Sequence, residues 1–181
     1  MELVINEENL RNQEIQEFNS KVRALLVDEN NNILVANYGG VYLLPGGSID
    51  EGEDIYNAIT RELNEELGQK YDKDELELIC TLLYYQKNYP KRNDTYRNRL
   101  IQTYYFVGKS KGVLETKQKL TEKELKDNFK LESIPLEELE RIILENKSNN
   151  PRNIYFKKEL LAILKQYKND INVKKLKLNN I

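Results

Sequence analysis

Residues 46–69 read GGSIDEGEDIYNAITRELNEELGQ, and the rest of the chain is interpreted outward from this stretch. It begins with two glycines, passes through an acidic loop and continues into a helix expected over 54–67. Asp54 is a good N-cap, because its side-chain oxygen can accept hydrogen bonds from the free amides of the first turn. Gly68 suits the left-handed conformation that often ends a helix. The stretch is therefore predicted to be a glycine turn, an acidic loop and one capped helix.

The acidic residues of this helix lie on its apolar side. The apolar residues that define the face are Ile55, Ala58, Ile59 and Leu63. On a helical wheel with Ile55 at zero, Glu66 falls at roughly 20° and Glu62 at roughly 340°, with Glu65 at roughly 280° near the edge. Like charges beside a core are unfavourable unless cations neutralise them. Carboxylates at this spacing can converge on a hard divalent ion such as Mg²⁺, so the helix is predicted to form one wall of a metal site.

The stretch resembles the box that defines the Nudix hydrolases. That box is Gly, five residues, Glu, seven residues, then Arg-Glu-aliphatic-any-Glu-Glu-any-Gly-aliphatic. The matching residues here are Gly47, Glu53, Arg61, Glu62, Leu63, Glu65, Glu66 and Gly68. The last aliphatic position departs from the pattern because it holds Gln69, at a position that serves packing in the family. An acidic amphipathic helix without a site is the competing interpretation, but it explains neither the spacing nor the acids on the apolar side.

The resemblance implies an α/β fold, a Nudix-type α/β/α sandwich with a mixed sheet and C-terminal helices. One domain is expected over 1–168, and 169–181 is a candidate for a mobile tail. Strands are expected over 21–27, 33–36, 41–44, 76–85, 100–107 and 129–134, after a short strand and an irregular or helical lead-in within 1–20. A polar loop is expected over 89–96 and a charged loop with a helical turn over 109–126. One helix is expected to begin at Pro135, and a final helix is expected to include Phe156 to Tyr167.

The resemblance also implies a metal-dependent reaction. Nudix enzymes cleave a phosphoanhydride in a nucleoside diphosphate linked to another moiety, and divalent ions neutralise and orient such an anionic group. The ligands implied for Mg²⁺, with Mn²⁺ as an alternative, are Glu62, Glu65, Glu66, the Gly46 carbonyl and Glu132. The general base stays open between Glu62 and an acid of a distant loop, for which Glu122 and Glu124 are the candidates.

Substrate contacts are expected from the glycine turn and from residues downstream of the box. Gly47 lets the backbone approach a ligand closely. Arg61 is a candidate catalytic residue together with Glu53, and is expected to hold that acid rather than to contact substrate. Relatives that act on dinucleoside polyphosphates often carry a tyrosine where Tyr84 and Tyr85 stand, and only one of these neighbours can face the pocket. Nucleoside tri- or polyphosphates are therefore the expected substrates, and ADP-ribose or another nucleotide sugar is the alternative.

Composition narrows the chemistry further. A chain of 181 residues favours one domain, and the formal net charge of −2 provides no global basic field for nucleic acid. Cys80 is the single cysteine and there is no histidine, which excludes a disulfide framework and every histidine-based mechanism. The sequence shows neither a basic-apolar leader nor an 18-residue apolar span, so a cytoplasmic protein without membrane contact is expected. The oligomeric state is left open.

Two other functional classes remain as alternatives. A Nudix-fold module that binds a nucleotide without hydrolysing it typically lacks box acids, whereas this chain retains them. A single-strand binder is suggested by tyrosine-rich strands with Lys91, Arg92, Arg97 and Arg99. The negative net charge argues against it, and no stable binding of nucleic acid is expected.

Overall fold

The structure, a computed structural model, describes residues 1–178 except 92 and 94, and describes only the backbone of 172–178. Its strands are β1 (Glu2–Ile5), β2 (Glu17–Val27), β3 (Asn32–Tyr38), β4 (Val41–Leu43), β5 (Leu76–Pro90), β6 (Tyr96–Lys109) and β7 (Lys130–Pro135). Its α-helices are α1 (Ile55–Leu67), α2 (Glu122–Lys126), α3 (Leu136–Glu145) and α4 (Asn153–Leu178). Three short 3-10 helices are η1 (Asn12–Glu14), η2 (Lys73–Glu75) and η3 (Glu115–Lys117).

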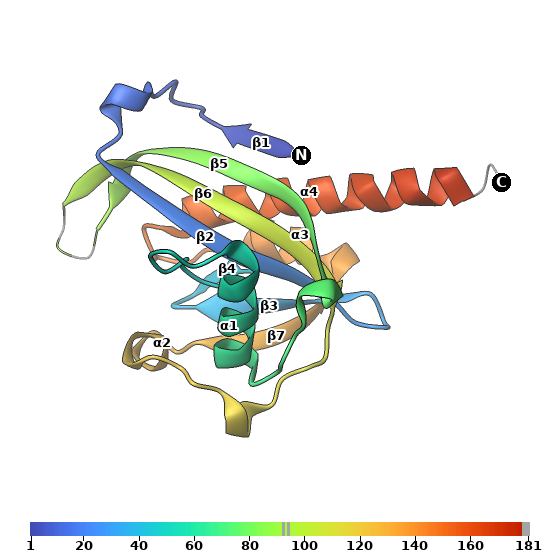
Figure 1. The fold of residues 1–181 in the computed structure, drawn as a ribbon. Helices are drawn as coiled ribbons and strands as arrows, with labels where there is room; N and C mark the ends of the chain where they lie inside the picture. The colour runs from blue at the N-terminus through green and yellow to red at the C-terminus, as the bar shows by residue number, and fades with distance from the viewer. Residues whose placement is uncertain (92, 94, 179–181) are drawn as a thin grey trace.

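The strands form one mixed sheet with helices on both faces (Figure 1). The strand order is β1-β5-β6-β2-β3-β4, and β7 pairs with β3. Strands β5 and β6 form a long antiparallel hairpin, whereas β1 pairs with β5 and β2 pairs with β6 in parallel. The α/β class with a mixed sheet and C-terminal helices is therefore confirmed.

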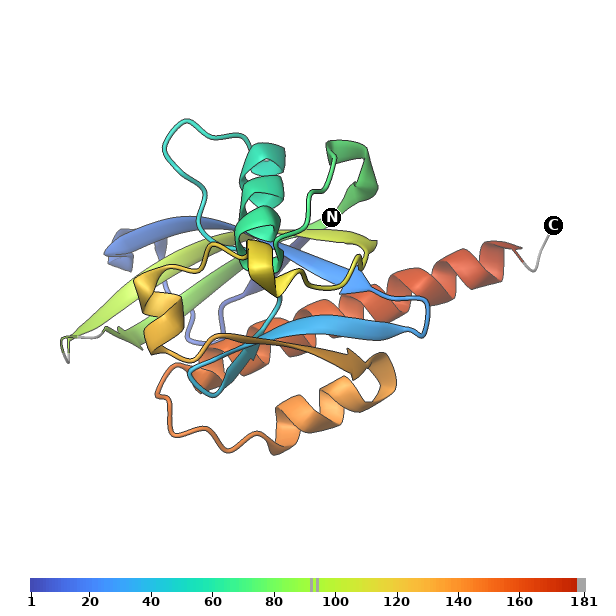
Figure 2. The same cartoon turned by 90° about the horizontal axis from the view of Figure 1, so that it is seen from below.

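Each face of the sheet carries its own hydrophobic core. Along β2, Val22, Ala24 and Leu26 pack on the α1 side, while Leu25 packs on the side of α3 and α4. This alternation follows from the two-residue period of a strand. Figure 2 shows α1 on one side of the sheet and α3 with α4 on the other, so the molecule has three layers.

The predicted strands are all present, but β2, β3, β5 and β6 are longer than the sequence pattern indicated. Strand β2 begins at Glu17 because its ladder with β6 continues to the pair Glu17–Arg99. The loop predicted over 89–96 is wrong at both ends, since β5 runs to Pro90 and β6 begins at Tyr96. The ladder resumes beyond a bulge at Gln86/Tyr89, where the Arg99 guanidinium carbon lies 3.2 Å from the centre of the Tyr89 ring.

The C-terminal region is helical. Pro135 is the N-cap of α3, as expected. Helix α4 passes through the start of the expected tail and continues to Leu178, extending beyond the sheet (Figure 1). Residues 179–181 lie outside the described residues, and the mobility of the tail and the domain limit at 168 stay predictions. In the described part of the chain, no helix is long and apolar enough to cross a membrane.

Candidate active site

Helix α1 begins and ends at the predicted caps. Asp54 Oδ1 accepts hydrogen bonds from the amides of Tyr56 and Asn57, at 2.9 and 3.1 Å. Gly68 ends the helix in the left-handed region, with φ of 67°. The helix that carries the box acids is thus held at both ends by the residues that the sequence indicated.

A segment far along the chain also secures the C-terminal end of α1. We call residues 114–119 the strap. The Leu114 amide donates to the Leu67 carbonyl at 2.8 Å, and the Lys119 amide donates to the Glu65 carbonyl at 2.8 Å. Gln118 Nε2 donates to the Glu66 carbonyl at 2.6 Å. The strap therefore satisfies carbonyls that a helix end otherwise leaves without partners, and two of them belong to box acids.

The glycine turn is fixed against β2 by a buried arginine. Arg23 is only 6% exposed, and its Nη1 donates to the carbonyls of Leu44 and Gly46, at 2.7 Å each. Gly46 has φ of 129°, and a Cβ there would lie 2.3 Å from the Val22 carbonyl oxygen. Only glycine fits this conformation and this close approach.

The most buried box acid contacts this turn directly. Glu66 is 4% exposed, and its Oε2 accepts a hydrogen bond from the Gly46 amide at 2.8 Å. Burial raises the pKa of Glu66 to about 8, although the charge of Arg23 and the Gly46 amide oppose that shift. Its carboxylate is therefore costly to ionise unless a further cation joins Arg23 beside it.

The next acid on the same side of the helix approaches the second glycine. A Cβ at Gly47 would lie 2.3 Å from Glu62 Oε1, so the absence of a side chain leaves room for this carboxyl group. Burial raises the pKa of Glu62, while its hydrogen bond from Arg61 lowers it. Glu62 and Glu66 thus flank the double-glycine turn, from the side of the helix on which the helical wheel placed them.

Arg61 connects the acids at the rim of the site. Its Nε and Nη2 donate to the two carboxylate oxygens of Glu53, at 2.9 Å each, so the predicted pairing with Glu53 is confirmed. Its Nη1 lies 2.9 Å from Glu62 Oε1 and 3.5 Å from Glu65 Oε2. This hydrogen bonding lowers the pKa of Glu53 and raises that of Arg61.

The donor types at the site suit a hard divalent cation. Carboxylate oxygens of three glutamates and the Gly46 carbonyl are the ligands that Mg²⁺ prefers. The buried carboxyl group of Glu66, and the Glu62 carboxyl group that fills the place of a side chain at Gly47, also fit a site that receives positive charge. As they stand, no three acidic side chains among the described residues converge closely enough to hold an ion, because Glu62 and Glu65 turn toward Arg61. Binding a cation would require these two to exchange part of their contact with Arg61.

The remaining candidate acids lie apart from this group. Glu132 faces the α3–α4 side of β7 and accepts a hydrogen bond from Asn37 Nδ2 at 3.3 Å. Among the described residues, no hydrogen bond or ion pair joins Glu132 to a box glutamate. Glu124 caps the first turn of α2 through Thr121, and its charge contributes to the raised pKa of Glu66. Glu122 lies exposed on the same short helix.

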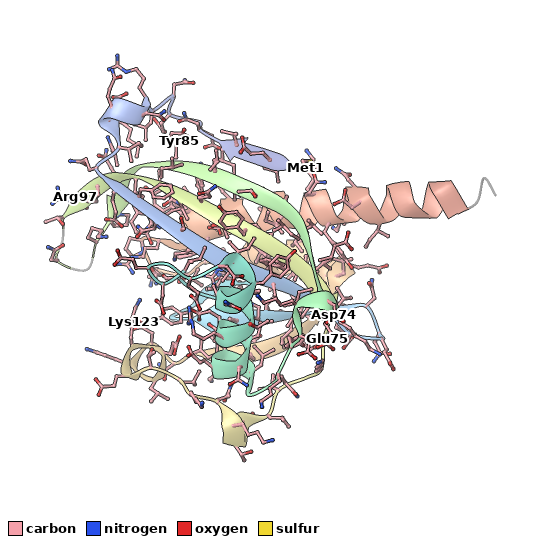
Figure 3. The ribbon with its side chains drawn as sticks, viewed as in Figure 1. Met1, Asp74, Glu75, Tyr85, Arg97 and Lys123 are labelled. Carbon is pink, nitrogen blue, oxygen red and sulfur yellow. The ribbon has the colours of Figure 1, made fainter. Side chains whose placement is uncertain are left out.

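The two tyrosines occupy opposite faces of β5, as expected. Tyr84 is buried on the side of α4, where its ring packs against Tyr155 with centroids 6.3 Å apart. The hydroxyl of Tyr85 donates to Asn12 Oδ1 at 3.1 Å, toward the N-terminal segment (Figure 3). Neither has a recorded contact with a box residue, and a substrate role for either stays a prediction.

Sequence reasoning missed Arg23 and the strap. Arg23 shares its strand face with Leu25, so an arginine at an inward position of KVRALLV was a usable signal. The strap carried no signal, because its bonds to α1 depend on how a polar loop folds back.

Comparison with known proteins identifies the family. The family model for the NUDIX domain matches residues 17–158. The chain belongs to the Nudix family. A comparison with curated proteins finds no match.

Solved structures share the Nudix fold with this chain. The NUDIX domain of NrtR from Shewanella oneidensis, described as a complex with ADP-ribose, has a TM-score of 0.54 and 16% identity, covering 90% of this chain and 94% of that one. A NUDIX hydrolase from Nitrosomonas europaea has a TM-score of 0.52 and 16% identity, covering 81% and 90%. A MutT NUDIX hydrolase from Burkholderia pseudomallei has a TM-score of 0.47 and 20% identity, covering 67% and 86%. At these identities the first two neighbours support the Nudix α/β/α fold and nothing finer.

Proposed function

We propose that the protein is a Mg²⁺-dependent hydrolase that cleaves a phosphoanhydride bond in a nucleoside diphosphate linked to another moiety. The observation that carries this proposal is the burial of Glu66 and Glu62 against the double-glycine turn. A divalent cation bound there supplies neutralisation of pyrophosphate charge and activation of water. Glu62, Glu65, Glu66 and the Gly46 carbonyl would hold it.

The other residues of the site act on these ligands and on substrate. Arg61 is a positioning residue, because its fork on Glu53 fixes the guanidinium that orients Glu62 and Glu65. Gly47 stays a candidate substrate contact through its backbone, and its missing side chain leaves room for the Glu62 carboxyl group beside it. The general base is Glu62 or an acid of the distant segment that contains α2, where Glu124 is favoured over Glu122 by its electrostatic effect on Glu66. Glu132 remains a candidate for an additional ligand.

Nucleoside tri- or polyphosphates are the favoured substrates in this proposal. The expectation rests on the tyrosines at positions 84 and 85. ADP-ribose is the second candidate, because the neighbour with the TM-score of 0.54 is described in complex with that compound. A binding module without hydrolysis is less well supported, since Glu62, Glu65 and Glu66 are all retained.

A substrate panel tests this proposal. Purified protein with Mg²⁺ is incubated with nucleoside di- and triphosphates, dinucleoside polyphosphates, ADP-ribose and nucleotide sugars, and the products are identified. We expect nucleotide polyphosphates to be cleaved faster than ADP-ribose. Faster turnover of ADP-ribose would overturn the substrate assignment, and tight binding without cleavage of any nucleotide would indicate the binding module.

A further inference from the structure

Strand β2 carries a second cation next to the arginine of the glycine turn. Lys21 and Arg23 lie on the same face of the strand, opposite Thr103 and Tyr105 of β6 in the ladder. The Arg23 guanidinium donates to the carbonyls of the turn. The Lys21 side chain is half-buried, yet none of the described residues forms a hydrogen bond or an ion pair with its ammonium group. A half-buried ammonium without a partner is unfavourable, and an anionic ligand would remove that cost.

The groups that surround Lys21 are mainly positive. Its own strand presents Arg23, β6 presents Arg99 and α2 presents Lys123, while α4 presents the carboxylate of Glu159. Lys123 stands on α2 at the same end of the sheet as the loop that leads into α1 (Figure 3).

Glu159 is the acidic group among these neighbours, and it forms no ion pair with Lys21. The Tyr105 hydroxyl donates to the Glu159 carboxylate. Arg99 donates to Gln86 Oε1 at 2.5 Å, so its contact is with a neutral group. Burial first, and then the charge of Arg23, lower the pKa of Lys21 to about 7. The region therefore has excess positive charge that an anion would complement.

We propose that Lys21 donates a hydrogen bond to a phosphate group of the substrate beyond the pyrophosphate held at the box acids, and so selects nucleotides with three or more consecutive phosphates. This inference rests on the proposed function. Alternate strand residues are about 7 Å apart, which places Lys21 one step along β2 from the arginine that holds the Gly46 carbonyl. Lysine serves as a point charge for phosphate, whereas a neutral sugar would leave its charge uncompensated.

Calorimetry with inorganic tripolyphosphate and pyrophosphate tests the inference without requiring turnover. The proteins compared are the wild type, Lys21→Met, Lys21→Arg and the control Lys147→Met, which alters an exposed lysine in the loop after α3. With Mg²⁺ present, Lys21→Met should weaken tripolyphosphate binding by roughly 10- to 100-fold, the scale of one hydrogen bond to a charged group, and pyrophosphate binding by much less. Lys21→Arg should retain most of the affinity, and Lys147→Met should match the wild type.

A second readout reports on the amine itself. With lysine ε-carbons labelled for NMR, tripolyphosphate should raise the pKa of Lys21, an effect that a purely structural lysine would not show. Tripolyphosphate affinity that is unchanged in Lys21→Met, or equal losses for both ligands, would overturn the inference. If the wild type cleaves no nucleotide, the proposed function fails, while these binding results still decide the role of Lys21.

Discussion

Arg23 shows how one side chain can fix the turn on which the site depends. It is buried, and it donates hydrogen bonds to two carbonyls of the glycine turn. Its charge lowers the pKa of Glu66 and so offsets part of the increase that burial causes. Arg23→Met leaves two buried carbonyl acceptors without this donor, so we expect the free energy of unfolding to fall by about 3 kcal/mol, since a hydrogen bond to a charged group contributes about 1.5 to 3 kcal/mol. Urea unfolding measures this, and Arg11→Met, at an exposed pair with Glu14, is the control and should change stability by less than about 0.5 kcal/mol. A loss for Arg23→Met no larger than that of the control would contradict the assignment.

The positions of the box acids on α1 were predictable, because they follow from the spacing of residues along a single helix. The wheel placed Glu66 and Glu62 inside the apolar arc and Glu65 at its edge. In the structure Glu66 is 4% exposed, and the side chains of Glu62 and Glu65 are 13% and 37% exposed. The Arg61–Glu53 pair spans one loop and part of a helix, and was also predicted. The bonds from Arg23 to the turn were not, because they join strands that are distant in the sequence and depend on their register.

Among the elements, α1 depends on the strap for the position of its acidic end. Gln118→Ala removes the side-chain donor to the Glu66 carbonyl, so we expect a loss of about 1 kcal/mol in unfolding free energy and a higher Mg²⁺ concentration for half-maximal activity. Gln69→Ala removes a comparable bond to the Lys111 carbonyl in an exposed position and is the matched control. An equal effect of both variants on the Mg²⁺ requirement would show that the strap does not position the acids.

The strands show where local patterns stop being informative. The apolar centres of β5 and β6 were recognised, but their polar ends were interpreted as a loop. Alternation weakens there, and the ladder is maintained instead by the pairing of Tyr89 with Arg97 and by the stacking of Arg99 on Tyr89. These cross-strand contacts are visible only once the two strands are aligned.

For the whole molecule, the burial of Glu66 links stability to pH and to metal. The folded pKa of about 8 lies above the ordinary value of 4.5, so the folded state keeps a proton that the unfolded state releases between these values. With a chelator present, the contribution of Glu66 to the free energy of unfolding should therefore be highest below pH 4.5. It should fall as the pH rises from 4.5 and should be lost once the pH passes about 8. The fall should be smaller in Glu66→Gln, as measured by urea unfolding at several pH values. Equal slopes in both proteins would contradict this assignment.

Binding of a divalent cation should offset the loss of stability that occurs as the pH rises. A cation that binds only the folded state stabilises it by about 2.7 kcal/mol at a hundredfold excess over its dissociation constant. The melting temperature at pH 8 should rise with Mg²⁺ or Mn²⁺, and the rise should disappear in Glu66→Gln. An identical melting curve with and without saturating metal in the wild type would count against the metal site.

The most direct test of the central claim is the Mg²⁺-dependent turnover of the nucleotide panel by the wild type, Glu65→Gln and Glu66→Gln. Products are resolved by phosphorus NMR, and circular dichroism verifies that each variant is folded. Each substitution removes a carboxylate proposed to hold the ion that neutralises charge in the transition state. We predict that both folded variants lose at least roughly 100-fold in turnover, the scale of losing one electrostatic contact in a transition state. Near-normal Mg²⁺-dependent turnover in both variants would contradict the account.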